Sequence, residues 1–235
     1  MEDKKPVIAV VLSGCGVFDG AEIHESVLSL LEIEQNGGVA KCYAPDMEQY
    51  HVLDHTSGEE MDQKRNVLIE SSRIARGDIT PLKELNVNDV DGIMLPGGFG
   101  AAKNLTEWAF SGPEGNINQE VKRVINDAIN SEKPIGAVCM GPTVVAKALQ
   151  NTDHEVELTI GTTESSSPYD INGIAQGVEA TGAKAVNKEA NEVQIDEKHK
   201  IFTSPCYNME ASITDVHKGI QKTVKELLSH VKVPG

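Results

Sequence analysis

Two kinds of hydrophobic pattern alternate along the chain, and together they predict an α/β fold. Short apolar runs without polar alternation are typical of strands that are covered on both faces. Such runs occupy residues 7–12, 41–44, 92–95, 135–138 and 157–161. Residues 192–196 and 200–204 predict a hairpin or a further strand pair, because a short polar segment separates them. We therefore expect a mostly parallel sheet at the centre of the fold.

Apolar residues recur at helical spacing between these runs. The pattern is clearest from residue 22 to about residue 36, where Gly37 and Gly38 end it. Further helices are expected at residues 66–76, 118–131, 142–149, 171–181 and 211–231. Strands that alternate with helices indicate a sheet wrapped on both faces, whose ligands bind beyond the carboxyl ends of the strands.

Composition and charge narrow the classes of partner. The 235 residues, 39% of them hydrophobic, supply enough core for one domain, and no repeat or linker divides residues 1–235. A net charge of −15 repels nucleic acid and anionic membrane surfaces, so a small soluble molecule is the expected partner. No apolar stretch reaches the roughly 18 residues that cross a bilayer, and MEDKK lacks the apolar core of a secretory signal. A cytoplasmic location is therefore expected.

The cysteines do not form a recognisable framework. Cys15, Cys42, Cys139 and Cys206 are too few and too widely separated for a set of disulfides or a CxxC metal site. Reduced thiols are expected, and no metal. Of the four, Cys42 and Cys206 receive no role, and Cys15 lies on a loop after the first strand, where it is either a pocket residue or small-residue packing.

Three glycine-bearing turns follow predicted strands, and one of them presents a cysteine. In CMGP the strand 135–138 delivers Cys139 directly into a helix start, a geometry typical of a nucleophile elbow, with Gly141 as a small neighbour. Partial positive charge at a helix start favours a thiolate, so we expect a lowered thiol pKa. The alternative is a buried cysteine that only fills space, since free cysteine is among the most buried residue types.

The second turn, LPGGFG, supplies candidate hydrogen-bond donors. Consecutive glycines let backbone N–H groups approach a ligand, so Gly97 and Gly98 are expected to form an oxyanion-type site with the N–H of Met140. The alternative is an ordinary tight turn, which is the commoner use of two adjacent glycines.

Taken together, GAEIHE, LPGGFGAAKNL and GAVCMGP resemble the superfamily of the Parkinsonism-associated deglycase, PfpI peptidases and class I glutamine amidotransferase domains. The opening VVLSGCGVFDGAEIHES and the later SRIARGDI are most similar to its ElbB (enhancing lycopene biosynthesis) branch. The resemblance implies a flavodoxin-like three-layer sandwich with a mostly parallel sheet and a nucleophile-elbow cysteine. It also implies a homodimer.

The resemblance assigns roles to matching positions. Cys139 takes the elbow position and Gly98 that of an oxyanion-type donor. Glu25 takes the position of the buried acid, because the family pattern places that acid five residues after Gly20. A carboxyl beside a thiol in a partly dry cleft has a raised pKa and can carry a proton. The alternative, a solvated glutamate that favours the helix dipole, fits Glu22 better.

Departures from the family limit what the resemblance implies. PfpI-type peptidases have His where this chain has Met140, so proteolysis is not expected. Glutamine amidotransferases activate the thiol with a His-x-Glu pair, and no histidine of this chain after the elbow has that spacing, so glutaminase activity is not expected either. The histidine that deglycase members carry after the elbow helix has no clear counterpart, and weak activity is therefore expected.

The remaining chemistry needs only a thiol and a carboxyl. We expect a glyoxalase-type conversion of glyoxal or methylglyoxal to a 2-hydroxy acid by Cys139 and Glu25, with no cofactor. Glu22, Cys15 and Asn104 are further pocket candidates. The alternative from another class is a non-catalytic redox sensor or binding module of the ElbB type, in which an exposed, low-pKa Cys139 is oxidised or binds a ligand without turnover.

Two other site types are weighed and not favoured. The glycines of SGCGVFDG are spaced GxGxxxG, and a turn at Asp19 and Gly20 delays the helix, so the dinucleotide fingerprint is not matched. His51 and His55 have i, i+4 spacing that suits a metal on a helix, but no HExxH-type glutamate accompanies them, so a polar loop is predicted.

Overall fold

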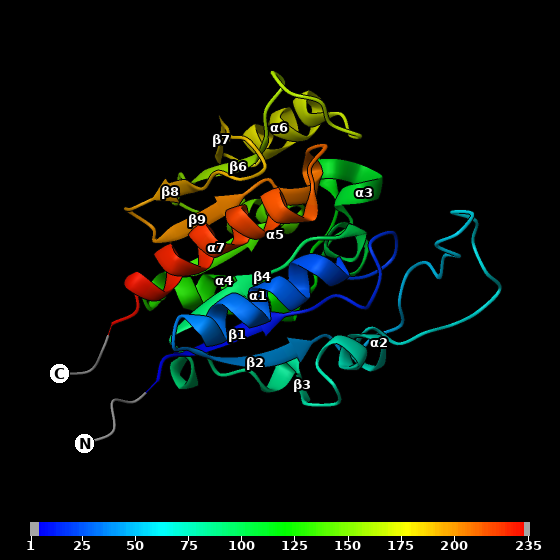
Figure 1. Ribbon diagram of the computed structural model, residues 1–235, viewed down its shortest axis with the longest axis horizontal. Helices are drawn as coiled ribbons and strands as arrows, with labels where there is room; N and C mark the ends of the chain where they lie inside the picture. Colours follow the sequence, from blue (N-terminus) through cyan, green and yellow to red (C-terminus); the bar gives the residue numbers. More distant parts are fainter. Residues whose placement is uncertain (1–4, 233–235) are drawn as a thin grey trace.

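The centre of the fold is a seven-stranded sheet (Figure 1), seen in a computed structural model that describes residues 5–232. Its strand order is β3-β2-β1-β4-β5-β9-β8. The strands are β1 (Val7–Val11), β2 (Val39–Ala44), β3 (Ile79–Pro81), β4 (Gly92–Leu95), β5 (Ile135–Val138), β8 (Gln194–Asp196) and β9 (Ile201–Ser204). Neighbouring strands are parallel except β8, which pairs antiparallel with β9 at one edge. The predicted parallel sheet and terminal hairpin are thus confirmed.

Helices cover both faces of this sheet, so the expected three-layer α/β sandwich is confirmed (Figure 1). On one face α1 (Ile23–Gln35) packs along α7 (Ile213–Ser229), and on the other α4 (Gln119–Asn130) packs against α5 (Gly141–Leu149). The helix α2 (Val67–Ile74) lies beside β2 and β3. None of the helices within residues 5–232 combines the length and the apolar character that a membrane span requires.

Two features of the fold differ from the sequence-based expectation. The predicted strand 157–161 is β6 (Glu157–Gly161), but it pairs with β7 (Lys184–Asn187) in a separate two-stranded sheet. Neither β3 nor β7 was predicted, because both are short and only partly buried. This second sheet packs with α6 (Ile171–Ala180) at one end of the molecule, and α3 (Trp108–Ser111) lies nearby.

Polar residues fix where several helices begin. The side chains of Asn66, Asn118, Asp170 and Ser212 each accept a hydrogen bond from a backbone N–H in the first turn of the helix that follows. Such caps satisfy N–H groups that have no partner inside the helix and typically contribute about 1 kcal/mol each. Caps of this kind explain why the predicted helix boundaries lie within a few residues of the observed ones.

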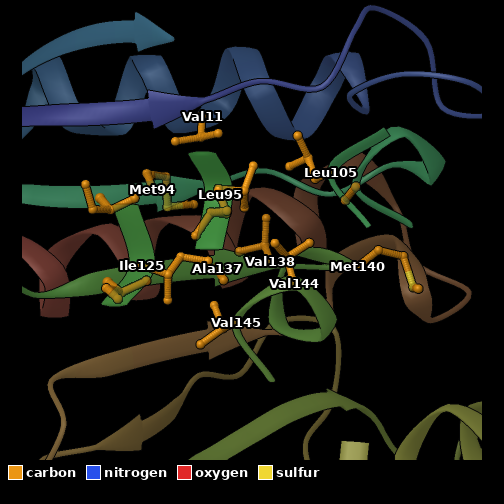
Figure 2. Packing of buried hydrophobic residues seen from close by; sticks show 14 of the residues in the cluster. Val11, Met94, Leu95, Leu105, Ile125, Ala137, Val138, Met140, Val144 and Val145 are labelled. Atoms are coloured by element: carbon orange, nitrogen blue, oxygen red, sulfur yellow. The ribbon is translucent and has the colours of Figure 1, made fainter. Parts of the chain in front are cut away.

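The core is made of aliphatic side chains from the central strands and the helices beside them. Figure 2 shows Met94 and Leu95 of β4 beside Ala137 and Val138 of β5, with Val145 of α5 nearby. All four residues of β4 and of β5 are buried, as expected for strands covered on both faces.

The direction of the chain reverses between β1 and β4. From β1 the chain proceeds outward to β2 and β3, and it then returns to place β4, β5 and β9 on the other side of β1. The loops that follow β1, β4 and β5 therefore meet at the carboxyl ends of these central strands. Open α/β sheets bind their ligands at such a switch point.

Replacement of a central core residue should destabilise the protein strongly. Ile93 is fully buried in β4, so we expect Ile93→Ala to lower the free energy of unfolding by about 2–5 kcal/mol. The matched control is Ile69→Ala, because Ile69 is 62% exposed, and its effect should stay below about 0.5 kcal/mol. Urea unfolding measures both values, and equal losses would contradict the assignment of β4 to the core.

Candidate active site

Cys139 lies at a strained elbow between β5 and α5. Its backbone φ is 56°, in the left-handed region that residues with a side chain rarely adopt. Its N–H donates to the carbonyl of Ser204 at 3.0 Å, which continues the pairing of β5 with β9. The helix begins at Gly141, one residue before the expected start, and a Cβ there would lie 2.6 Å from the carbonyl oxygen of Leu95. The predicted elbow geometry is present.

The glycine pair after β4 allows three segments to meet. A Cβ on Gly97 would lie 2.7 Å from both Cys139 Sγ and Glu25 Oε2. Gly98 has a φ of 93°, and a Cβ there would collide with the backbone of Gly20 and Glu22. Glycine is required at both positions because neighbouring segments approach the backbone too closely for a side chain, and not only because of the turn.

Glu25 is fully buried against the cysteine. Its Oε2 accepts the N–H of Gly97 at 3.0 Å, and its Oε1 accepts the N–H of Tyr207 at 3.2 Å. Burial, reinforced by the neighbouring Glu22 carboxyl, raises the pKa of Glu25 to about 8, although hydrogen bonds from the N–H groups of Tyr207 and Gly97, and the neighbouring Cys139 thiol, oppose the shift. A buried carboxyl with such a pKa can both take up and release a proton near neutral pH.

Glu22 differs from the solvated residue that its position suggested. It is 8% exposed, and its carboxylate accepts the N–H of Glu25 at 2.7 Å as the cap of α1. Burial raises its pKa. Its own N–H donates to the carbonyl of Gly97 at 2.9 Å, so Glu22 fixes the start of α1 against the glycine turn.

The expectation of a lowered thiol pKa at Cys139 is wrong. The side chain is 4% exposed, and burial, followed by the Glu25 carboxyl, raises the pKa of the thiol well above its usual range. Hydrogen bonds from the N–H groups of Gly98 and Met140 act in the opposite direction. A helix start contributes only about 0.3–1 kcal/mol, which is less than the desolvation of a buried thiolate. The N–H of Gly97 is engaged by Glu25, so the expected donors at the sulfur reduce to two.

Asn208 is a site residue that the sequence did not suggest. The Cys139 thiol donates to Asn208 Oδ1 at 3.2 Å, and Asn208 Nδ2 donates to the carbonyls of Cys139 and Ile160 at 2.7 and 2.9 Å. Asn208 closes a 3₁₀ turn (Cys206–Asn208) after β9. The strand-end argument that selected Cys139 also applies to this turn, and it is the signal that could have found Asn208.

A cavity of about 50 Å³ opens onto the sulfur. Its lining is mainly apolar and aromatic, and comprises Val17, Gly98, Phe99, Cys139, Met140, Tyr169, Ile174, Tyr207 and Asn208. Phe99 and Tyr169 pack edge to face, with ring centroids 5.6 Å apart. None of the lining residues carries a charge at neutral pH. The cavity has room for a molecule of a few heavy atoms.

Other candidates from the sequence lie outside this cavity. Cys15 is half-buried in the loop after β1, and Asn104 is buried with its amide donating to the carbonyls of Ser13 and Asp19. Neither lines the cavity.

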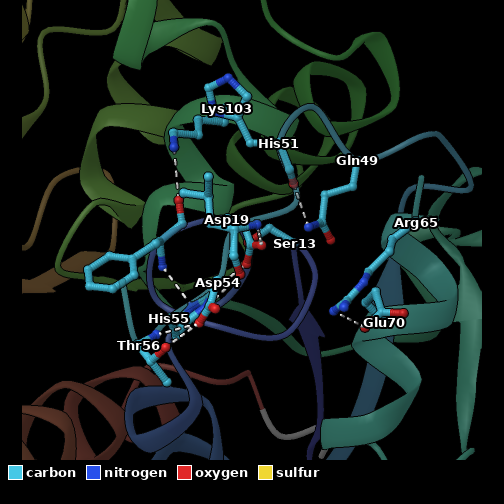
Figure 3. Close-up of polar contacts among 12 residues, drawn as sticks. Ser13, Asp19, Gln49, His51, Asp54, His55, Thr56, Arg65, Glu70 and Lys103 are labelled. Carbon is cyan, nitrogen blue, oxygen red and sulfur yellow. Dashed lines mark hydrogen bonds and ion pairs between the residues drawn. The ribbon is translucent and has the colours of Figure 1, made fainter. Parts of the chain in front are cut away.

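The loop after β2 is polar, as predicted, and contributes to a network outside the cavity (Figure 3). His55 Nε2 accepts the N–H of Phe18 at 3.2 Å and lies 3.8 Å from an Asp19 carboxylate oxygen. His51 lies nearby in the same segment. Within residues 5–232, no group of three or more His, Cys, Asp or Glu side chains is placed to hold a metal ion.

Comparisons with known proteins agree with this fold. Residues 62–231 match the family model described as glutamine amidotransferase class-I. The chain is 42% identical over 223 residues, 94% of its length and 82% of the relative's, to the "ES1 protein homolog, mitochondrial" of Rattus norvegicus.

Solved structures share the fold. An isoprenoid biosynthesis protein with an amidotransferase-like domain from Ehrlichia chaffeensis has a TM-score of 0.85 and 33% identity, covering 96% of this chain and all of that one. Glyoxalase III of Candida albicans has a TM-score of 0.62 but only 14% identity, covering 97% and 98%, so it shows the fold alone. The resemblance to the ElbB branch is confirmed.

The expected cytoplasmic location is corrected by the same comparisons. The rat relative and its human counterpart, which is also 42% identical, are both named mitochondrial, as is a zebrafish relative. The sequence-based expectation relied on the first residues of the chain and is wrong, because these relatives point to mitochondria.

The buried carboxyl should make stability depend on pH. Because the folded-state pKa of Glu25 is raised from 4.5 to about 8, its contribution is fully present below about pH 4.5 and is lost as pH rises through 8. We therefore expect Glu25→Gln, which cannot ionise, to gain stability relative to the unsubstituted protein as pH rises from 5 to 9. Between those two pKa values the relative gain is at most about 1.4 kcal/mol for each step of one in pH.

Urea unfolding at several pH values measures this difference. Glu34→Gln, an exposed glutamate on the same helix, is the control for the loss of a carboxylate. A constant difference between Glu25→Gln and the unsubstituted protein from pH 5 to 9 would contradict the raised pKa.

Proposed function

This chain belongs to the glutamine amidotransferase class-I family, and from that premise we propose that it converts small 2-oxoaldehydes such as glyoxal and methylglyoxal into 2-hydroxy acids. One observation carries the proposal: the Cys139 thiol contacts a fully buried carboxyl, Glu25, whose pKa of about 8 suits proton transfer near neutral pH. The uncharged cavity at the sulfur has the size of such an aldehyde.

The first step is addition of the thiol to the aldehyde. Glu25, as the carboxylate, takes the thiol proton while a bond forms between Cys139 Sγ and the aldehyde carbon. The proton then passes to the aldehyde oxygen, which gives a hemithioacetal. In this proposal the N–H groups of Gly98 and Met140, which hydrogen-bond to the sulfur, stabilise negative charge that develops on that oxygen.

Proton transfer between the two carbons completes the conversion. Glu25 removes the hydrogen from the carbon bonded to sulfur and returns a proton to the neighbouring carbon through an enediol, which leaves a thioester of the 2-hydroxy acid. Water then cleaves the bond between carbon and sulfur, releases the acid and restores the thiol. One carbon is oxidised and the other reduced, so only water is added overall.

The site supports this chemistry better than the reaction in the family's name. Hydrolysis of glutamine by this family type uses a histidine to activate the thiol, and none of the described residues that line the cavity is a histidine. Among the described residues that line the cavity, none is charged and able to bind the amino acid's carboxylate or ammonium.

A redox-sensing role is the other candidate, and the geometry weighs against it. A sensor cysteine is exposed and ionised, whereas Cys139 is 4% exposed with a raised thiol pKa. A role in binding without turnover is the remaining alternative. It would be supported if aldehydes bind and are not converted.

Activity should rise with pH and require both groups. Because Glu25 must lose its proton to act as base, we expect kcat/KM for glyoxal to rise through a midpoint near pH 8. Cys139→Ala should abolish turnover. Glu25→Gln should lower kcat/KM by about 10²–10⁴-fold and remove the rise with pH.

Formation of glycolate measures this activity, with Cys15→Ser as the control because Cys15 does not line the cavity. Turnover by Cys139→Ala at the original rate would refute the mechanism. Turnover by none of the proteins would leave a binding role.

The cavity should select uncharged substrates. Glyoxylate resembles methylglyoxal in size but carries a carboxylate, which an apolar cavity beside Glu22 and Glu25 would desolvate and repel. Glyoxylate cannot be converted, because the carbon beside its aldehyde is already a carboxylate, so its binding is measured as inhibition of methylglyoxal turnover. We expect its inhibition constant to be at least about 100-fold higher than that of 2-methylpropanal, an uncharged aldehyde of similar shape, because the cavity would have to desolvate an unpaired charge. Initial rates of methylglyoxal loss at increasing concentrations of each inhibitor measure this ratio, and comparable constants would contradict the proposed role of the cavity.

A further inference from the structure

We infer that Asn208 is a positioning residue that holds Cys139 as a neutral thiol and directs its proton while the site is empty. The inference rests on the proposed function for its catalytic meaning, but it concerns the state of the sulfur and can be tested without turnover. It goes beyond the proposed roles of Cys139 and Glu25, because it assigns the resting protonation state to a third side chain.

Hydrogen bonding fixes the orientation of the Asn208 amide. Its Nδ2 donates to two backbone carbonyls, of Cys139 at 2.7 Å and of Ile160 at 2.9 Å. Carbonyl oxygens only accept, so the NH₂ group must face them and Oδ1 must face the sulfur at 3.2 Å. An amide flip would place oxygen against two oxygens and is excluded.

This orientation selects the protonation state of the cysteine. An amide oxygen can only accept a hydrogen bond, and a thiolate has no proton to donate. The contact between Asn208 Oδ1 and Sγ is therefore favourable for a thiol and repulsive for a thiolate. No side-chain rotation relieves it, because both amide hydrogens are already committed.

The surroundings keep Asn208 in this position. It is fully buried, its N–H donates to the carbonyl of Pro205 at 3.0 Å, and its own carbonyl accepts the hydroxyl of Ser167 at 2.5 Å. Asn208 thus ties the elbow on β5 to β6, across two different sheets. The nucleophile is consequently formed only when the thiol turns toward an ionised Glu25, and the resting sulfur is protected from alkylation and oxidation.

A purely structural role is the rival explanation, and two substitutions separate it from the inference. Asn208→Ala removes the acceptor at the sulfur and both donors to the carbonyls. Asn208→Asp also removes the NH₂ group but keeps an oxygen at the sulfur. This holds if the new carboxyl is ionised, and also if its other oxygen carries a proton that is donated to a backbone carbonyl. Looser packing would affect both variants in one direction, whereas loss of the acceptor affects only the alanine variant.

The experiment is alkylation of Cys139 by iodoacetamide across pH 6–11, read by mass spectrometry of the peptide that contains it. For Asn208→Ala we expect the midpoint of the rate to fall by about one pH unit, equivalent to one hydrogen bond and to about tenfold faster reaction at neutral pH. For Asn208→Asp we expect a midpoint no lower than that of the unsubstituted protein. Ile174→Ala, which enlarges the cavity without touching the contact, is the control for solvent entry.

Several outcomes would overturn the inference. These are an equal fall in Asn208→Ala and Ile174→Ala, a fall in Asn208→Asp, or faster alkylation at every pH with an unchanged midpoint. If Asn208→Ala does not fold, Asn208→Asp decides alone, because an unchanged or higher midpoint supports the acceptor role. Absence of aldehyde turnover would refute the proposed function while leaving this measurement intact.

Discussion

The contact between the Cys139 thiol and the Glu25 carboxyl, made where Gly97 has no side chain, is the constraint on which the site depends. It requires the loops after β1, β4 and β5 to converge at the carboxyl ends of these strands, and it leaves no room for a Cβ at Gly97. The strained backbone of Cys139 belongs to the same arrangement, because the residue lies at the turn from β5 into α5. Such backbone strain costs on the order of 1–3 kcal/mol, which the buried strands on either side can offset.

Exclusion of water explains the electrostatic character of the site. A thiol and two carboxyls lie close together in space, and the structure offers no cation among the residues that line the cavity. Neutral forms are then favoured for all three groups, and their pKa values rise together. This environment suits a reaction in which a proton moves between the thiol and a neighbouring carboxyl. It does not suit a reaction that starts from a free thiolate.

The exclusion of water also strengthens the effect of Asn208 on the charge of the sulfur. The backbone N–H groups of Gly98 and Met140 favour negative charge at the sulfur, whereas Asn208 and Glu25 oppose it. In the proposed mechanism, a site balanced in this way reacts only when an aldehyde and an ionised Glu25 are both present.

The sequence by itself determined the elements that carry continuous patterns and the residues that carry local motifs. The runs at 7–12, 92–95 and 135–138 had to be central strands because they have no polar face, and the elbow at Cys139 followed from a strand joined to a helix through small residues. Short, partly exposed strands such as β3 lack that signal. Only the tertiary structure decided the sign of the thiol's pKa shift, the burial of Glu22 and the contacts of Asn208. These properties depend on solvent exclusion and on hydrogen bonds between segments that are far apart along the chain, and no local pattern encodes them.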